Sequence, residues 1–427
     1  MGDHKTGLSV ALYAVLALVG ANVCSQASAQ TIEIAGSTRS GAPIVRLSGF
    51  PPRADVHVSY TRPTPGPAYR SSATYRTNQQ GVVELSTSPV AGDWKTPFPE
   101  APYWTMKADP AASMPRDGVV LLQARSGVIS AQAEYPLPVE PAATIEPVAT
   151  FPGAFLARPT GASGPLPLII VLGGSEADDL TARLIAPRLA AAGFAALGLP
   201  YRSPLREGRQ AIPGLPTVFS EIPVDQLEQV HAWARNDRRV DARRIGLWGF
   251  SKGAELALIA ASNYDWIDAV AAISPSDVVW EGFGSGTVER TGTPSFSLKG
   301  RPMAFVPYGA PGRLRDAKEI GRWQNPDRAA AARIPVENYG GRLLVAGGAK
   351  DRSWDSAGMA QSIAERRSEA GRSTVSLIFP DANHLLTAPA LVPVELGTAG
   401  GTVEGNGQAR LEIWDATVRL FQDAWRR

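Results

Sequence analysis

The chain has 427 residues, more than the roughly 250 to 300 at which a single hydrophobic core stops growing, and so we expect two domains. Its composition, with 44% hydrophobic and 19% charged residues, is that of a globular enzyme and excludes a disordered chain. The formal net charge is only +2, and acids and bases are interspersed, so the sequence offers no basic stripe for a nucleic-acid backbone. We therefore expect no nucleic-acid partner.

The first 29 residues differ in composition from the rest. A short polar start precedes an almost wholly apolar run over residues 7–19, and Ala27-Ser28-Ala29 follows it. This pattern predicts a secretory signal peptide over residues 1–29, a periplasmic or secreted mature protein and no stable membrane insertion after cleavage; an uncleaved membrane anchor is the alternative. Cys24 is the only cysteine, so its removal would exclude disulfides and cysteine nucleophiles.

The segment after the signal peptide alternates short apolar runs with turn residues. Four of these runs cover residues 44–47, 56–60, 81–85 and 119–122. Such spacing predicts an all-β antiparallel sandwich over residues 30–137, as an accessory domain. The Pro- and Ala-rich stretch that follows predicts a semi-rigid linker over residues 138–150.

Beyond residue 150, buried apolar strands alternate with amphipathic helices. We expect strands at residues 168–172, 194–199, 244–249, 269–273, 343–346 and 375–379, and helices at 180–191, 224–235 and 254–260. This alternation is typical of a parallel sheet in an α/β fold. Residues 151–427 are therefore predicted to form the catalytic domain, with residues 275–339, which lack periodicity, as a lid-like insertion.

The pentapeptide Gly249-Phe250-Ser251-Lys252-Gly253 lies between an expected strand and an expected Ala-rich helix. A serine on a sharp strand-to-helix turn needs small residues two positions before and after it, because neighbouring backbone comes close there. The short motif alone is weak, since it also occurs by chance. Its placement makes Ser251 the candidate nucleophile of an α/β-hydrolase.

A serine nucleophile needs an imidazole base, and a carboxylate that orients the base. Of the four histidines, His384 follows an expected strand in the order Ser, acid, His, and is the candidate base. Asp351 lies closest to the end of the preceding strand and is the candidate acid. Asp355 more readily caps the following helix, and Asp381 more readily forms a turn.

Two backbone N–H groups should stabilise the oxyanion of the tetrahedral intermediate, one after the nucleophile and one after the first central strand. These positions are Lys252 and the Gly174-Ser175 region, although the glycines could also form a simple tight turn. This chemistry uses no metal and no organic cofactor, and none is predicted.

These residues resemble the acyl-CoA thioesterase and bile acid-CoA:amino acid N-acyltransferase family, through nearly the whole mature chain. The segments that carry the resemblance are Leu47-Ser48-Gly49-Phe50-Pro51-Pro52, Tyr75-Arg76, Val83-Glu84-Leu85, Tyr103-Trp104-Thr105-Met106, Phe219-Ser220-Glu221-Ile222-Pro223, Gly249-Phe250-Ser251-Lys252-Gly253, Ile334-Pro335-Val336-Glu337, Asp351-Arg352-Ser353-Trp354, and His384-Leu385 with Pro389. The resemblance implies an immunoglobulin-like domain, an α/β-hydrolase domain and the triad roles for Ser251, Asp351 and His384.

The resemblance also implies a reaction in fatty acid metabolism: attack on an acyl thioester, an acyl-enzyme, and release to water or to an amino-acid amine. Amidating members of the family use cysteine at the elbow and hydrolytic members use serine, so Ser251 favours hydrolysis. Because export would separate the enzyme from cellular CoA, an exported carboxylesterase or peptidase remains an alternative, as does a non-catalytic binding module.

Two further groups of side chains have competing interpretations. Trp280, Phe283, Phe296 and Phe305 could line an acyl pocket, but packing is the simpler interpretation. The arginines Arg202, Arg206 and Arg209 are expected on a solvated face.

Overall fold

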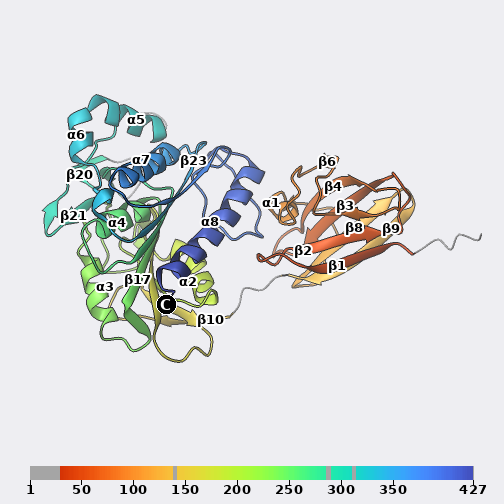
Figure 1. Cartoon of the computed structure of the whole chain (residues 1–427), viewed down its shortest axis with the longest axis horizontal. Coiled ribbons are helices and arrows are strands. Elements are labelled where there is room, and N and C mark those ends of the chain that lie inside the picture. The colour runs from red at the N-terminus through yellow and green to blue at the C-terminus, as the bar shows by residue number, and fades with distance from the viewer. Residues whose placement is uncertain (1–28, 138–141, 285–289, 310–313, 427) are drawn as a thin grey trace, which may run out of the picture.

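The computed structural model describes residues 29–137, 142–284, 290–309 and 314–426. Two β-rich parts follow one another along the chain, a sandwich and a larger part with helices on both faces of its sheet (Figure 1). The predicted signal peptide therefore lies almost wholly outside the described residues. So does part of the predicted linker, residues 138–141.

The N-terminal part consists of two antiparallel sheets around an apolar core. One sheet has the order β1-β2-β5 and the other the order β6-β4-β3-β8-β9, with β7 paired to β4. The elements are β1 (Thr31–Ser37), β2 (Pro43–Ser48), β3 (Asp55–Arg62), β4 (Tyr69–Arg76), β5 (Val83–Glu84), β6 (Ala91–Gly92), α1 (Ala101–Trp104), β7 (Lys107–Ala108), β8 (Val119–Ser126) and β9 (Ile129–Pro136). Strands that alternate inward and outward residues, such as β2, bury one face between the sheets.

The C-terminal part is built on one sheet of eight strands in the order β10-β11-β13-β12-β17-β18-β23-β24. Strands β10 and β11 run antiparallel to their neighbours, and the remaining pairs are parallel. The strands are β10 (Ala143–Pro147), β11 (Phe155–Pro159), β12 (Leu166–Leu172), β13 (Ala195–Gly198), β17 (Val240–Phe250), β18 (Ala269–Ile273), β23 (Arg342–Gly348) and β24 (Val375–Phe379). The central strands are apolar on both faces, which requires a layer of helices on each side.

Helices supply both layers. They are α2 (Leu180–Ala191), α3 (Gln226–Ala234), α4 (Lys252–Ala261), α7 (Ser356–Glu369) and α8 (Val403–Ala424). The helices α2 and α8 pack on one face of the sheet, and α3, α4 and α7 pack on the other (Figure 1). The predicted α/β-hydrolase fold with a preceding β-sandwich is confirmed.

The predicted insertion, residues 275–339, contains short strands and helices that lie outside the eight-stranded sheet. The elements of this region and of the loops beside it are β14 (Leu205–Arg206), β15 (Arg209–Gln210), β16 (Ile222–Pro223), β19 (Glu281–Phe283), β20 (Arg290–Pro294), β21 (Phe296–Leu298), β22 (Arg301–Pro302), α5 (Leu314–Gln324), α6 (Pro326–Ala331) and η1 (Val336–Asn338). Trp280 and Tyr308 form a small apolar cluster with Trp354, which precedes α7. We call residues 275–339 the cap.

The predicted linker over residues 138–150 is wrong for its second half. Residues 143–147 form β10, which pairs with β11 from Ala143 opposite Pro159 to Pro147 opposite Phe155. Of the prolines that suggested a linker, only Pro147 lies in β10, and it is tolerated because β10 is an edge strand, where no second neighbour needs its missing N–H.

The sandwich packs against α8 and against the chain between His384 and α8. The indole N–H of Trp104 donates to the carbonyl of Ala390 at 2.7 Å, and its ring lies so close to Gly407 that a Cβ there would be 2.1 Å from it. Leu391, Val394 and Leu396 join the apolar core of the sandwich. The sandwich thereby supports the segment that follows the candidate base.

Candidate active site

Ser251 lies on the sharp turn between β17 and α4. Its backbone has φ 54° and ψ −117°, a left-handed conformation that is strained for a residue with a side chain. A Cβ on Gly249 would lie 2.3 Å from the carbonyl oxygen of Gly253, and one on Gly253 would lie 2.2 Å from the carbonyl oxygen of Leu172. The turn therefore requires both glycines, as the sequence predicted.

The three candidate residues come together from three separate loops. The Nε2 atom of His384 is 2.9 Å from the Oγ atom of Ser251, and its Nδ1 atom is 2.7 Å from Oδ2 of Asp351. All three residues are buried, Asp351 completely. The imidazole thus bridges the hydroxyl and the carboxylate, which is the geometry of a serine nucleophile, its base and the orienting acid.

Asp351 is held in its ionised form. Burial alone would raise the pKa of this carboxyl, but the neighbouring His384, with hydrogen bonds from surrounding groups, lowers the pKa below its usual value. Its Oδ1 atom accepts hydrogen bonds from the backbone N–H groups of Ser353 and Trp354, at 2.7 and 3.2 Å. The rival carboxylate Asp355 instead caps α7 and accepts from the N–H of Gly358 at 3.3 Å, in agreement with the sequence-based expectation.

The predicted oxyanion donors differ in whether their backbone N–H groups already donate a hydrogen bond. Lys252 is the first residue of α4, where a backbone N–H has no partner within the helix, and Ser175 donates no backbone hydrogen bond within the described part of the chain. The prediction for Gly174 is wrong, because its N–H donates to Oε1 of Glu176 at 2.9 Å. The carboxylate of Glu176, two residues further along, was the signal in the sequence for this local turn.

Two buried side chains that sequence reasoning missed hold the Gly173–Ser175 turn in place. The hydroxyl of Tyr201 donates to the carbonyls of Gly173 and Gly174, at 2.6 and 3.0 Å. The guanidinium of Arg202 donates to the carbonyl of Ser175 at 2.8 Å, and only 2% of this residue is exposed. The expected solvated face is therefore wrong for Arg202, because backbone carbonyls satisfy its charged group in the interior.

The aromatic residues of the cap are packing residues. Trp280, Phe283 and Phe296 are buried, and Phe283 stacks on Phe219 with ring centroids 4.7 Å apart. They agree with the simpler of the two interpretations. The ring of His231 stacks on Trp266, so this histidine also packs, away from the triad.

A buried lysine of the cap faces the loop that carries the acid. The Nζ atom of Lys318, on α5, lies 3.3 Å from the carbonyl oxygen of Ser353 and 4.2 Å from the ring centroid of Trp354. Burial and the charge of Lys252 lower the pKa of Lys318 to about 7, although Asp351 and Glu255 oppose the shift. The sequence predicted no helix in this segment, and so it did not mark Lys318.

Lys318 should make the stability of the protein depend on pH. Between about pH 7 and 10 the unfolded chain binds a proton that the folded protein does not, so the free energy of unfolding rises with pH in this window. We expect wild type to gain roughly 2–3 kcal/mol relative to Lys318→Met between pH 7 and pH 9.5 in urea denaturation. A difference between the two proteins that does not change with pH would contradict the shift.

The fold and the site together define a serine-type hydrolase of the α/β-hydrolase class. Residues 222–426 match the profile of "BAAT / Acyl-CoA thioester hydrolase C terminal", residues 43–125 that of "Acyl-CoA thioester hydrolase/BAAT N-terminal region", and residues 153–282 that of the "Dienelactone hydrolase family". The chain belongs to the acyl-CoA thioester hydrolase/BAAT family, as the resemblance predicted.

Relatives of known name match over almost their whole length. Acyl-coenzyme A thioesterase 1 of Rattus norvegicus is 26% identical over 92% of this chain and 95% of its own. Acyl-coenzyme A thioesterase 6 of Mus musculus is 27% identical over 93% of this chain and 96% of its own. Among solved structures, the acylaminoacyl peptidase of Pyrococcus horikoshii aligns with a TM-score of 0.41 at 12% identity, covering 85% of this chain and 55% of the peptidase.

No helix among the described residues is both long and apolar enough to cross a lipid bilayer.

Proposed function

We propose that the protein hydrolyses acyl thioesters of the acyl-CoA type through an acyl-enzyme on Ser251. The observation that carries the proposal is the hydrogen-bonded series from Ser251 through His384 to Asp351, in a chain of this family. The relatives named above as acyl-coenzyme A thioesterases support the substrate class.

In the first half of the reaction, the Oγ atom of Ser251 attacks the thioester carbonyl carbon while Nε2 of His384 takes the hydroxyl proton. The backbone N–H groups of Lys252 and Ser175 donate to the oxyanion that forms. Collapse of the intermediate breaks the carbon–sulfur bond, and the imidazolium of His384 returns the proton to the leaving thiolate. The products of this half are a free thiol and an ester on Ser251.

In the second half, water attacks the ester carbonyl and gives its proton to His384. Ionised Asp351 keeps the imidazole in the tautomer that can accept this proton, and stabilises the imidazolium. Collapse of the second intermediate releases the carboxylic acid and restores the Ser251 hydroxyl with the proton from His384.

The test compares thioesters with matched oxygen esters. Purified protein is given acyl-CoAs of graded chain length and oxygen esters of the same acyl groups, and steady-state kcat/KM is measured for each. We expect the thioesters to be preferred. Turnover of oxygen esters or peptides without any thioester preference would replace this proposal with a carboxylesterase or peptidase.

A second proposal concerns location: residues 1–29 form a signal peptide, and the mature enzyme is periplasmic or secreted. It is supported by the apolar run over residues 7–19 and by Ala27-Ser28-Ala29. The full chain is expressed in a bacterial host and the N-terminus of the exported protein is sequenced. A mature chain that starts at Gln30 is expected; cytoplasmic protein that retains residue 1 would contradict export.

A further inference from the structure

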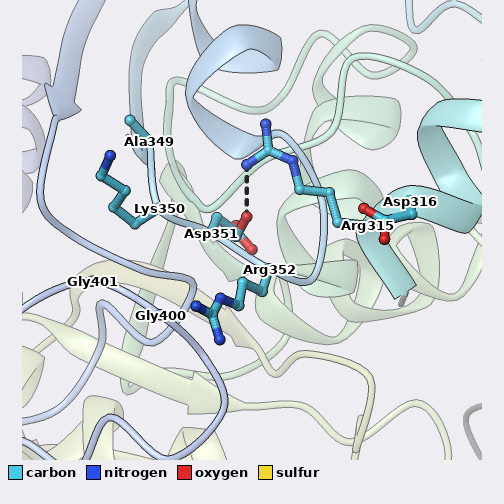
Figure 2. A pocket seen from close by; sticks show the side chains of 8 residues that line it. All are labelled: Arg315, Asp316, Ala349, Lys350, Asp351, Arg352, Gly400 and Gly401. Atoms are coloured by element: carbon cyan, nitrogen blue, oxygen red, sulfur yellow. Dashed lines mark hydrogen bonds between the residues drawn. The ribbon is translucent and has the colours of Figure 1, made fainter. Parts of the chain in front are cut away.

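A pocket of about 270 Å³ borders the loop that carries Asp351. It lies between three segments: α5 of the cap, residues 349–352 of the acid loop, and Gly400-Gly401 ahead of α8. Figure 2 shows Arg315 reaching from α5 toward Asp351, with Lys350 and Arg352 on either side of the acid. We call this site the basic pocket.

The side chains of the basic pocket carry excess positive charge. Arg315 is neutralised and fixed, because it pairs with Glu319 and Asp355 and donates to the carbonyl of Asp351 at 2.7 Å. Lys350 and Arg352 are exposed, and neither has a carboxylate within ion-pair distance in the part of the chain that the structure describes. Two uncompensated cations therefore border the pocket, against the single exposed acid that also lines it, Asp316.

The wall opposite the acid loop offers backbone donors. Gly400 and Gly401 have φ of 87° and 73°, and neither donates a backbone hydrogen bond to another described residue. A Cβ on Gly400 would lie 2.4 Å from the carbonyl oxygen of Lys350, so the glycine lets this wall approach the acid loop closely. Consecutive N–H groups with unusual backbone angles, beside cations, form the kind of concavity that binds anions.

We propose that the basic pocket binds the phosphate groups of the thioester's leaving group. This inference rests on the proposed thioesterase function and adds a location for substrate recognition. Phosphate oxygens suit both kinds of donor found here, guanidinium or ammonium groups and backbone N–H groups. The pocket borders Asp351, whereas the thioester must reach Ser251, which His384 separates from Asp351. The long flexible arm of CoA can join two such positions.

The experiment compares two thioesters of one acyl group, the acyl-CoA and the acyl N-acetylcysteamine thioester, which lacks phosphate. The readout is the ratio of their kcat/KM values in wild type, in Lys350→Gln/Arg352→Gln and in the control Lys107→Gln, an exposed lysine on β7 of the sandwich. We expect the double variant to lower the CoA preference by about tenfold or more, and the control to keep the wild-type ratio. The preference in wild type should also fall with added sodium chloride.

Inorganic phosphate tests whether the basic pocket recognises the phosphate groups of the leaving group during turnover. If the pocket serves the leaving group, phosphate competes with the acyl-CoA and leaves turnover of the N-acetylcysteamine thioester unchanged. Equal inhibition of both substrates, or a ratio that the double variant does not change, overturns the inference. Turnover of the acyl-CoA by wild type then shows that thioesterase activity itself is intact, whereas the absence of turnover of both thioesters would refute the proposed function.

Discussion

Replacing Ser251 with alanine is expected to lower kcat for thioester hydrolysis by on the order of 10⁴- to 10⁶-fold, without unfolding the protein. The hydroxyl supplies the atom that becomes acylated, and only His384 contacts it in the triad. Alanine keeps the Cβ that the strained turn already accommodates. The measurement is steady-state turnover of the preferred acyl-CoA, together with circular dichroism to check the fold.

A matched control is Ser262, which follows the last residue of α4, whereas Ser251 precedes the first. The hydroxyl of Ser262 donates to the carbonyl of Leu258 at 2.8 Å and lies outside the site, so Ser262→Ala should keep nearly all of the activity. Members of a catalytic unit act together, so Ser251→Ala/His384→Ala should be little slower than Ser251→Ala alone. Additive losses, or substantial activity in Ser251→Ala, would mean that another group is the nucleophile.

The residues of the triad could be predicted because their constraints are local. Steric crowding fixes glycines around Ser251, and the order of strands along the chain fixes where Asp351 and His384 follow. With only four histidines in the sequence, a single one lay after a suitable strand. The apolar strands were equally clear, and β18 and β24 begin and end where the sequence predicted.

The parts that could not be predicted depend on contacts between distant segments. In the sequence Arg202 resembles a surface arginine. In the fold its guanidinium is buried and donates to the carbonyls of Ser175, Thr217 and Gly284. Lys318 lies in a helix of largely polar sequence that suggested no buried lysine, and its burial depends on the packing of Trp354 against it. Strand β10 was missed because the prolines in and before it suggest a linker, and only the free edge of β11 explains its pairing.

Lys252→Met is expected to destabilise the protein by about 3–5 kcal/mol, the usual cost of leaving a buried charge without its partner. The Nζ atom of Lys252 lies 2.7 Å from Oε2 of Glu255, and these side chains are only 3% and 0% exposed. The ring centroids of Phe219 and Phe296 lie 5.4 Å from the ammonium group, which is buried between α4 and the cap. Urea denaturation measures the loss, and Arg426→Met is the control, because its ion pair with Asp423 has the same spacing but is exposed and should be worth less than about 1 kcal/mol.

The double variant Lys252→Met/Glu255→Gln distinguishes the ion pair from simple packing. Glutamine removes the negative charge but keeps an acceptor for the backbone N–H of Trp280, which donates to Oε1 of Glu255 at 3.1 Å. If the cost of Lys252→Met is that of an isolated buried carboxylate, the second change should restore much of the lost stability. If the cost is lost packing of the lysine stem against Phe219 and Phe296, the double variant should be at least as unstable as the single one. Since Glu255 joins the nucleophile helix α4 to the cap at Trp280, recovery would also mean that a neutral hydrogen bond suffices at this contact.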